Sequence, residues 1–299
     1  MSCQITSLMP YVNLIVNAVA GAGKTQRIVS ESLASPEKKT LIVTYTNNNE
    51  AEIKSRFICE NGCIPSHVRI QTWFSFLLEH FVRPYQRSVL DMARVRGLAF
   101  VQGRSGQRIP ERRIKAHYFS SELDIYSDKI AKFGVRCEER SGGAVTGRLA
   151  QIFDHIYIDE VQDLVAWDLD VLELLLGASL NVTLVGDCRQ ATYSTNNAAK
   201  YPRFAGSRII DLFREWHGQG WCEVEDMYHS YRSIQTICDL ADYVFPMGIR
   251  TVSENADRTG HDGVFCVSRN DVPAYVERVQ PQALRYSRVT DAGGLVFAT

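Results

Sequence analysis

Short apolar runs alternate with segments of helical periodicity in the first part of the chain. A run that is mostly β-branched and apolar, such as Thr40–Tyr45, is typical of a strand buried on both faces. The expected strands are Leu14–Val16, Thr40–Tyr45 and Val68–Thr72, and the helices that follow them are Gln26–Leu33, Glu50–Cys59 and Trp73–Phe81. Strands that alternate with helices predict an α/β fold with a parallel sheet.

The same alternation resumes after residue 150. Strands are expected at Ile156–Ile158 and Val182–Val185, and helices at Ala166–Leu176 and Ile209–Trp216. Gly218 to Gly220 marks a break at which we place a domain boundary. Beyond it we expect one helix ending at Tyr243, a second near Ala274–Val279, and strands at Val264–Val267, Ala283–Tyr286 and 293–299.

The stretch between Arg83 and Arg148 has a different composition. It holds fourteen Lys and Arg against seven Asp and Glu, an excess of seven positive charges. Its densest part carries basic residues among glycines and rings: Arg104, Arg108, Arg112, Arg113 and Lys115 lie close to His117, Tyr118 and Phe119. Such interleaving suits a nucleic-acid backbone, with rings available for base stacking. A solvated surface without a specific ligand is an equally good interpretation from the charges alone.

The composition of all 299 residues, with 45% hydrophobic and 22% charged residues, is that of a globular protein. The net charge of −1 gives no global sign of a polyanionic partner, so any such surface must be local. Neither a membrane-spanning apolar run nor a signal peptide is found, and we expect a cytoplasmic protein without a membrane partner. The eight cysteines are scattered, and the single pair Cys59 and Cys63 is weak evidence for zinc.

A glycine loop follows the first expected strand. Gly21 and Gly23 allow backbone N–H groups to turn inward around phosphate oxygens, and a helix beginning near Lys24 adds the positive end of its dipole. Lys24 can reach the β- and γ-phosphates, and the Thr25 hydroxyl can bind Mg²⁺. The segment therefore predicts a P-loop that binds ATP. Its nucleotide-binding residues are Ala18, Val19, Ala20, Gly21, Ala22, Gly23, Lys24, Thr25 and Gln26.

Two later strands end in polar residues that suit the same chemistry. Asp159 and Glu160 directly follow the run Ile156–Ile158, where Asp159 can hold Mg²⁺ and Glu160 can polarise the attacking water. Two adjacent carboxylates at a strand end are costly unless a cation or hydrogen bonds hold them. Gln190, just beyond Val182–Val185, is a candidate sensor of the γ-phosphate.

Taken together, these segments resemble the UvrD/Rep-like superfamily 1 DNA helicases. The loop has the family's AxxGxGKT form, and Tyr45-Thr46-Asn47 with Glu52 resembles the motif that follows the second strand. Asp159-Glu160-Val161-Gln162-Asp163 matches D-E-x-Q-D, which is far more specific than a generic acidic strand end. Gly186-Asp187-Cys188-Arg189-Gln190 and Ser230-Tyr231-Arg232-Ser233 are similar to G-D-x-x-Q and N-Y-R-S. The order of the motifs along the chain is that of the family.

The resemblance implies a P-loop NTPase with two RecA-like domains. The first would comprise residues 1–82 and 151–217, an inserted basic DNA-binding subdomain would comprise 83–150, and a partial second domain 218–299. It implies that Gln190 senses the γ-phosphate, that Tyr231 stacks on the adenine and that Arg232 acts as an arginine finger. Residues expected near the DNA strand are Thr46, Asn47, Thr72 and Tyr193.

The chain also departs from the family pattern. Phe74 stands where the family usually carries His, and Thr195 where an aromatic residue usually stacks on a base. Two further motifs, expected after the point at which this sequence stops, are not found. We therefore expect a C-terminally incomplete copy, which could need a protein partner to supply the missing half.

Three functions fit these observations to different degrees. The first is a UvrD-like helicase that couples hydrolysis of ATP, with Mg²⁺, to 3′–5′ translocation on single-stranded DNA or at a single-strand/duplex junction. The second is an ATP-gated nucleic-acid-binding or regulatory subunit that does not unwind DNA. The third, a small-molecule P-loop kinase, leaves Gln162, Asp163 and Gln190 without a role.

Overall fold

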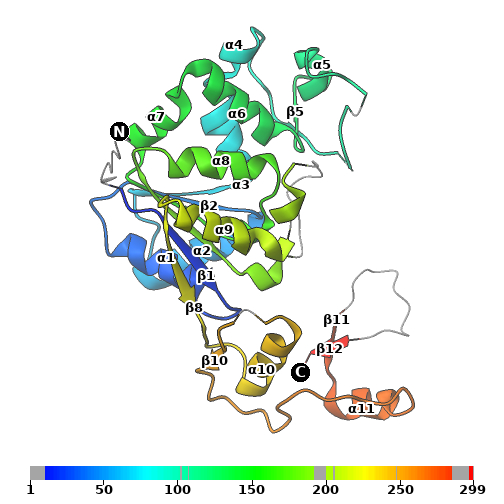
Figure 1. Cartoon of the computed structure of the whole chain (residues 1–299). Coiled ribbons are helices and arrows are strands. Elements are labelled where there is room, and N and C mark those ends of the chain that lie inside the picture. Colours follow the sequence, from blue (N-terminus) through cyan, green and yellow to red (C-terminus); the bar gives the residue numbers. More distant parts are fainter. Residues whose placement is uncertain are drawn as a thin grey trace, which may run out of the picture. The chain divides into compact units, whose positions relative to one another are not determined.

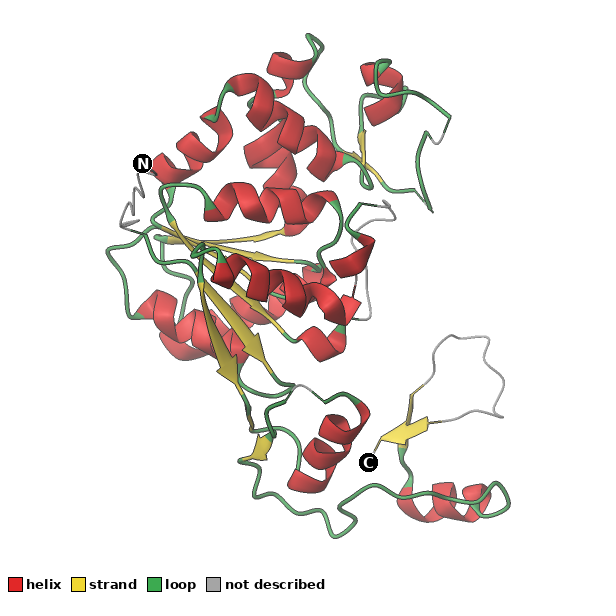
Figure 2. Cartoon of the chain, viewed as in Figure 1, coloured by secondary structure: helices red, strands yellow, loops and turns green. Residues whose placement is uncertain are grey.

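Six parallel strands form the central sheet of a computed structural model that describes residues 11–101, 103–106, 108–191, 200–204, 206–246, 248–284 and 296–298. The strand order is β3-β2-β6-β7-β1-β8, and every neighbouring pair is parallel. The strands are β1 Leu14–Ala18, β2 Thr40–Thr44, β3 Val68–Thr72, β6 His155–Ile158, β7 Asn181–Gly186 and β8 Glu223–Met227. The predicted α/β fold with a parallel sheet is confirmed (Figure 2).

Alternate side chains of the strands enter two apolar layers. Val16, Ile42 and Val185 pack on one face with residues of α1 Lys24–Leu33 and α2 Asn47–Asn61. The residues next to them in each strand point to the other face. That face is covered by α8 Trp167–Leu176 and α9 Ile209–Gly218, as Figure 1 shows. Because both faces are covered, the inner strands β2, β6, β7 and β1 are mostly apolar.

The strand β8 was not predicted, because its sequence, Glu223–Met227, is mostly acidic and polar. It pairs with β1 along its whole length, from Leu14 opposite Glu223 to Ala18 opposite Met227. The Arg27 guanidinium on α1 forms two hydrogen bonds with Glu225, of 2.6 and 2.9 Å. The first unit therefore extends past the glycine break, and the chain divides between Met227 and Tyr228.

The expected helix Trp73–Phe81 forms in two parts. A first turn, α3 Trp73–Phe76, continues into a π-helix, η1 Leu77–Val82. The buried Trp73 indole N–H donates to Asp168 Oδ1 of α8 over 2.8 Å, which fixes this helix against the sheet. Short 3₁₀ turns follow two strands, η2 Val161–Asp163 and η3 Cys188–Gln190. Two more, η4 Pro202–Phe204 and η5 Gly206–Arg208, precede α9.

The segment between η1 and β6, called the insert below, adds a small helical layer beyond α8 (Figure 1). Its elements are α4 Gln86–Val89, β4 Leu98–Ala99, α5 Ile114–Tyr118, β5 Ile125–Tyr126, α6 Ile130–Ser141 and α7 Ala144–Ile152. The helix α6 packs on both η1 and α8. The insert is therefore part of the first unit.

The prediction that Tyr118 and Phe119 offer free rings is wrong. Their side chains are 1% and 2% exposed, and both rings pack against Phe133 of α6 with centroids 5.0 and 5.1 Å apart. An insert of this size needs an apolar core of its own, and these rings supply it. The exposed ring of the insert is Phe100, at 72%.

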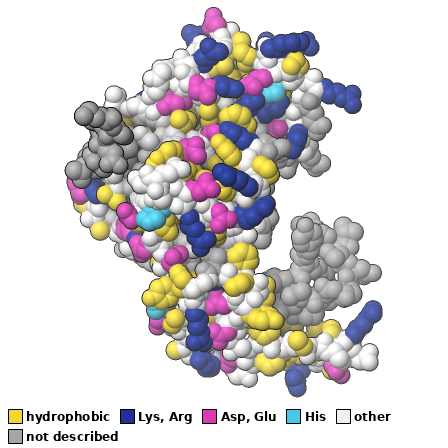
Figure 3. All heavy atoms as spheres, in the orientation of Figure 1, with side chains coloured by type: hydrophobic (Ala, Val, Ile, Leu, Met, Phe, Trp, Pro, Cys, Tyr) yellow, Lys and Arg dark blue, Asp and Glu magenta, His cyan; other side chains and the backbone are white. Residues whose placement is uncertain are grey.

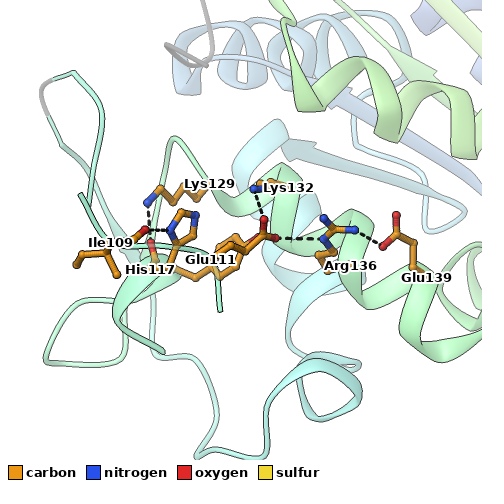
Figure 4. Close-up of polar contacts among 8 residues, drawn as sticks. Ile109, Glu111, His117, Lys129, Lys132, Arg136 and Glu139 are labelled. Atoms are coloured by element: carbon orange, nitrogen blue, oxygen red, sulfur yellow. Dashed lines mark hydrogen bonds and ion pairs between the residues drawn. The ribbon is translucent and has the colours of Figure 1, made fainter. Parts of the chain in front are cut away.

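A carboxylate lies among the basic side chains of the insert. Glu111 accepts hydrogen bonds from Lys132 and Arg136, and Arg136 also contacts Glu139 (Figure 4). The Tyr118 hydroxyl donates to Glu111 as well. Burial alone would raise the pKa of Glu111, but these donors outweigh it and lower the pKa to about 2. Part of the positive charge counted in the sequence is thus neutralised within the insert. On the face shown in Figure 3, Lys and Arg stand among Asp and Glu rather than in one continuous patch.

The second unit, from Tyr228 onward, has two short pairs of strands and two helices among its described residues. These are β9 His229–Ser230 with β10 Val252–Ser253, parallel, β11 Gln282–Leu284 with β12 Val296–Ala298, antiparallel, and the helices α10 Gln235–Val244 and α11 Val272–Val279. The expected strand Val264–Val267 is wrong. Gly260 and Gly263 have φ of 80° and 139°, and residues 264–266 are exposed, so no apolar face holds an extended segment there.

In the part of the chain described, no helix is long and apolar enough to cross a membrane.

We predict that Glu111→Gln destabilises the chain at neutral pH, by an amount on the order of 1 kcal/mol because the carboxylate is partly exposed and screened. The folded state lowers the pKa of Glu111 from 4.5 to about 2, so the unfolded chain binds more protons between these values. The stabilisation is complete above pH 4.5 and is lost as the pH falls toward 2. Urea unfolding of both chains at several pH values measures it. A wild-type minus variant difference that stays constant from neutral pH to pH 3 would contradict the assignment.

Candidate functional site

The carboxyl ends of all six strands lie on one edge of the sheet, because the strands are parallel. In open α/β sheets, ligands bind outside this edge. The residues that follow the strand ends here are the P-loop after β1, Tyr45 and Thr46 after β2, Trp73 after β3, Asp159 after β6 and Asp187 after β7. The topology thus brings together most of the residues that the sequence picked out.

The P-loop connects β1 directly to α1. Gly21 and Gly23 have φ of 74° and 80°, a left-handed conformation that residues with a Cβ adopt only under strain. Gly23 is the N-cap of α1 and has no side chain to bind the first N–H groups of the helix. Those N–H groups and the dipole of α1 therefore face the loop, which is the arrangement that binds phosphate.

Lys24 lies opposite a buried carboxylate. Its Nζ is 4.0 Å from Asp187 Oδ2, and the two side chains are 12% and 3% exposed. Asp187 Oδ2 accepts no hydrogen bond from the residues that the structure describes, while Oδ1 accepts one from the N–H of Arg189 over 3.0 Å. Burial raises the pKa of Asp187, and the charge of Lys24 opposes that rise. The ion pair between Lys24 and Asp187 is therefore weak, and the Lys24 ammonium can contact a second anion.

Asp159 and Glu160 lie at the end of the strand next to β7. Asp159 is 5% exposed, and burial, with the adjacent charge of Glu160, raises its pKa to about 7 despite the opposing charge of Lys24. The N–H of Glu160 donates to Asp159 Oδ1 over 3.0 Å. Glu160 itself has φ of 58°, an unfavourable value for a residue with a Cβ. Strain and buried charge thus coincide at this strand end.

Gln162 joins the two acidic strand ends, a role that the sequence did not reveal. Its Nε2 donates to Glu160 Oε2 over 2.6 Å, and its Oε1 accepts from the N–H of Asp187 over 3.1 Å. The contact requires Gly186, since a Cβ there would lie 2.5 Å from Gln162 Oε1 and 2.8 Å from Val161 Cγ1. The glutamine of D-E-x-Q-D therefore positions Glu160 relative to Asp187.

The oxygen ligands present fit Mg²⁺ bound together with a nucleotide. The cation usually takes one or two carboxylates and completes its shell with phosphate oxygens and water. The Thr25 hydroxyl and the buried, strained carboxylate of Asp159 are of this kind. Among the residues that the structure describes, no group of three or more His, Cys, Asp or Glu could hold a metal by itself, and this includes Cys59 and Cys63.

The other predicted site residues take no part in the contacts described above. Gln190 ends η3 and is exposed. Thr46 and Thr72 are the N-caps of α2 and α3, where their hydroxyls accept the N–H groups of Asn49 and Ser75, and Asn47 is exposed. Tyr193 lies outside the described residues. Tyr231 and Arg232 are exposed in a loop of the second unit, in which the Arg232 carbonyl accepts from Asn255 Nδ2 over 2.7 Å.

Two rings, Tyr45 and Phe74, follow the ends of β2 and β3, and a third, Phe100 of the insert, contacts Phe74. Phe74 lies between Tyr45 and Phe100, with ring centroids 6.1 and 5.7 Å away. Tyr45 and Phe74 are half-buried, whereas Phe100 of the insert is 72% exposed. This aromatic row (Tyr45, Phe74 and Phe100) is the type of surface on which bases stack. Phe100 has no sequence signal, because only the fold brings it to Phe74.

One family model matches part of the chain. The model described as the UvrD/REP helicase N-terminal domain matches residues 122–201, a range that includes Asp159, Glu160 and Asp187. The predicted resemblance to UvrD/Rep-like superfamily 1 helicases is confirmed by this match. No curated protein sequence matches the chain.

Among solved structures, the chain is similar to the Arterivirus nonstructural protein 10 (helicase). The match has a TM-score of 0.40 and 14% identity, and covers 83% of this chain and 42% of that chain. The same protein solved as a complex with DNA matches with a TM-score of 0.40 and 12% identity, over 83% of this chain and 43% of that one. This chain thus spans less than half the length of these structures.

We predict that Gly186→Ala destabilises the chain by about 1–3 kcal/mol, because the new methyl group must displace Gln162 or Val161. The matched control is Gly147→Ala in α7, where a Cβ meets nothing within 4 Å and helix propensity predicts a gain of about 0.5–1 kcal/mol. Urea unfolding measures both. Equal stabilities for the two variants would show that Gln162 does not pack as described.

Proposed function

We propose that this chain, of which residues 122–201 match the UvrD/REP helicase N-terminal domain, binds Mg²⁺ and ATP at the carboxyl edge of its sheet and uses hydrolysis to move along single-stranded DNA in the 3′–5′ direction. The observation that carries the proposal is the loose pair between Lys24 and buried Asp187, 4.0 Å apart, at the mouth of a P-loop. A phosphate can take the Lys24 ammonium from Asp187 without breaking a close ion pair.

The residues of the first unit take the following roles. The loop from Ala18 to Gln26 cradles the phosphates through backbone N–H groups, and Lys24 contacts the β- and γ-phosphates. The Thr25 hydroxyl and Asp159 would hold Mg²⁺, which neutralises charge on the phosphate oxygens when bound. Burial and the charge of Glu160 raise the pKa of Asp159. A cation bound there would stabilise the ionised form of Asp159.

Glu160 is the proposed base. Its Oε2 is held by Gln162, so one orientation of the carboxylate is favoured before substrate arrives. It accepts a proton from the water that attacks the γ-phosphorus, and ADP with its β-phosphate is the leaving group. Since Gln162 also binds the N–H of Asp187, the base and the strand that leads to Gln190 are linked. Gln190 as γ-phosphate sensor, Tyr231 as adenine contact and Arg232 as arginine finger complete the proposal.

The aromatic row is the proposed stacking surface for DNA. It begins at Tyr45, directly before Thr46 and Asn47, and Phe74 is two residues beyond Thr72. The DNA residues proposed from the motifs therefore border the row at two of its three rings. The family usually has His at the position of Phe74. Phe74 cannot make the polar contact of that His, but its ring packs against Phe100.

A Lys24→Ala chain should neither bind nor hydrolyse ATP, while Glu160→Gln should bind ATP and hydrolyse it about 10²–10⁴-fold more slowly. The wild-type rate should rise when single-stranded DNA is added. Steady-state phosphate release and binding of a fluorescent ATP analogue give the two readouts. Wild-type binding that survives in Lys24→Ala would remove the P-loop from the proposal. Binding without hydrolysis in the wild type would favour an ATP-gated nucleic-acid-binding subunit instead.

Phe100→Ala should weaken binding of single-stranded DNA by about 1–3 kcal/mol, the loss expected for one stacked base. Tyr243→Ala is a suitable control, since this ring is 84% exposed but lies on α10 of the second unit. Fluorescence anisotropy with a labelled oligothymidylate measures the affinities. If the two variants lose the same affinity, the aromatic row has no special part in binding.

A further inference from the structure

A cavity of about 530 Å³ with an unusual lining lies where η1 ends and the insert begins. Four arginines line it, Arg83, Arg87, Arg94 and Arg148, together with one carboxylate, Glu79. We call this cavity the arginine pocket. It belongs entirely to the first unit, and none of its residues was singled out by the sequence motifs. It is adjacent to a π-helix, a feature that occurs frequently at functional sites.

The positive charge of the arginine pocket is largely uncompensated. Glu79 accepts two hydrogen bonds of 2.7 Å from Arg69 and one from Gln71, so its charge is already paired outside the lining. The Arg83 guanidinium donates to the carbonyls of Val95 and Arg96, which are neutral acceptors. Arg87 has one 3.8 Å contact with Asp91, and both of these side chains are strongly exposed, so the pair is weak.

Arg148 faces a neutral group. Its NH1 lies 3.4 Å from Nδ1 of the buried His80, whose Nε2 lies 3.2 Å from Gln71 Oε1. Burial lowers the pKa of His80 to about 4, and the charge of Arg148 adds to the effect. The imidazole is therefore neutral at physiological pH and leaves the arginine charge in place. Nδ1 then accepts from Arg148, while Nε2–H donates to Gln71.

Two of the arginines are held in place before any ligand arrives. Arg83 is fixed by two backbone carbonyls and Arg148 by the imidazole, so little side-chain entropy is lost when they bind. The guanidinium group matches the geometry of phosphate oxygens and can donate to two of them at once. Among the described residues that line the pocket, none is an aromatic residue that could stack on a base. The pocket suits a phosphate group rather than a whole nucleotide.

The pocket and the aromatic row lie at opposite ends of one helix. Phe100 contacts Phe74 in the first turn of α3, and Val95 and Arg96 contact Arg83 just beyond η1. The segment from residue 95 to 100 therefore runs antiparallel to this helix. Nine residues separate Phe74 from Arg83, which corresponds to about 14 Å along the axis. A strand with bases on the aromatic row could reach the pocket within a few nucleotides.

We infer that the arginine pocket binds backbone phosphates of the nucleic-acid strand whose bases stack on the aromatic row. The inference rests on the proposed function, since it assumes that the chain binds single-stranded nucleic acid. It adds a phosphate contact site, formed by Arg83, Arg87, Arg94 and Arg148, that lies away from the P-loop. The pocket supplies sequence-independent affinity, and the row supplies stacking.

The salt dependence of DNA binding tests the inference. The variants are Arg94→Gln and the double variant Arg87→Gln/Arg94→Gln, because these exposed side chains can change without loss of a buried contact. Each phosphate contact with a single strand contributes about 0.7 to the slope of log affinity against log salt concentration. The slope should fall by about 0.7 in the single variant and about 1.4 in the double variant. Arg140→Gln, an exposed arginine at the end of α6 outside the pocket, should keep the wild-type slope.

The outcomes separate the inference from the proposed function. If the wild type binds oligothymidylate and the double variant keeps the wild-type slope, the inference is wrong while the proposed function stands. If the wild type does not bind oligothymidylate at any salt concentration, both fail. Titration of pyrophosphate into Lys24→Ala chains, with and without the double substitution, tests for a free polyphosphate instead. Pyrophosphate binding that depends on Arg87 and Arg94, with an unchanged DNA slope, would overturn the inference.

Discussion

Burial of negative charge at one edge of the sheet is the constraint on which the site depends. Asp159 and Asp187 follow adjacent strands and are 5% and 2% exposed, and Glu160 is beside them. The Lys24 ammonium approaches them, at 4.0 Å from Asp187. Removing a carboxylate from water costs several kcal/mol unless its charge is matched. The raised pKa values of both aspartates are the consequence, and a bound cation would relieve the excess charge.

The polar contacts around this edge hold the strand ends in a fixed relation. Gln162 binds both Glu160 and the backbone of Asp187, and only glycine at position 186 leaves room for it. On the other side, the buried bond from Trp73 to Asp168 fixes α3, and with it Phe74. The P-loop, Asp159, Tyr45 and Phe74 thus all follow strands of the same sheet.

The sequence predicted the parts of the molecule that depend on local order. Apolar runs located five of the six strands of the sheet, and polar residues at their ends located Lys24, Asp159 and Glu160 at one edge. β8 was missed because an acidic edge strand lacks an apolar pattern, although backbone pairing with β1 and Arg27 suffices to hold it. Tyr118 and Phe119 were misread because composition cannot distinguish a core ring from an exposed one. Phe100 and the arginine pocket require contacts between distant segments, which no local pattern encodes.

The most direct test of a Mg²⁺ and ATP site at this edge is the Mg²⁺ dependence of nucleotide binding, measured by calorimetry on the wild type and on Asp159→Asn. The wild type should bind ATP more tightly with Mg²⁺ than with EDTA. Asp159→Asn should bind ATP without that gain, because the amide keeps the shape of the side chain but removes the charge that holds the cation. An equal gain in both chains, or no gain in the wild type, would contradict the view that the buried carboxylates of this edge form a cation site for the nucleotide.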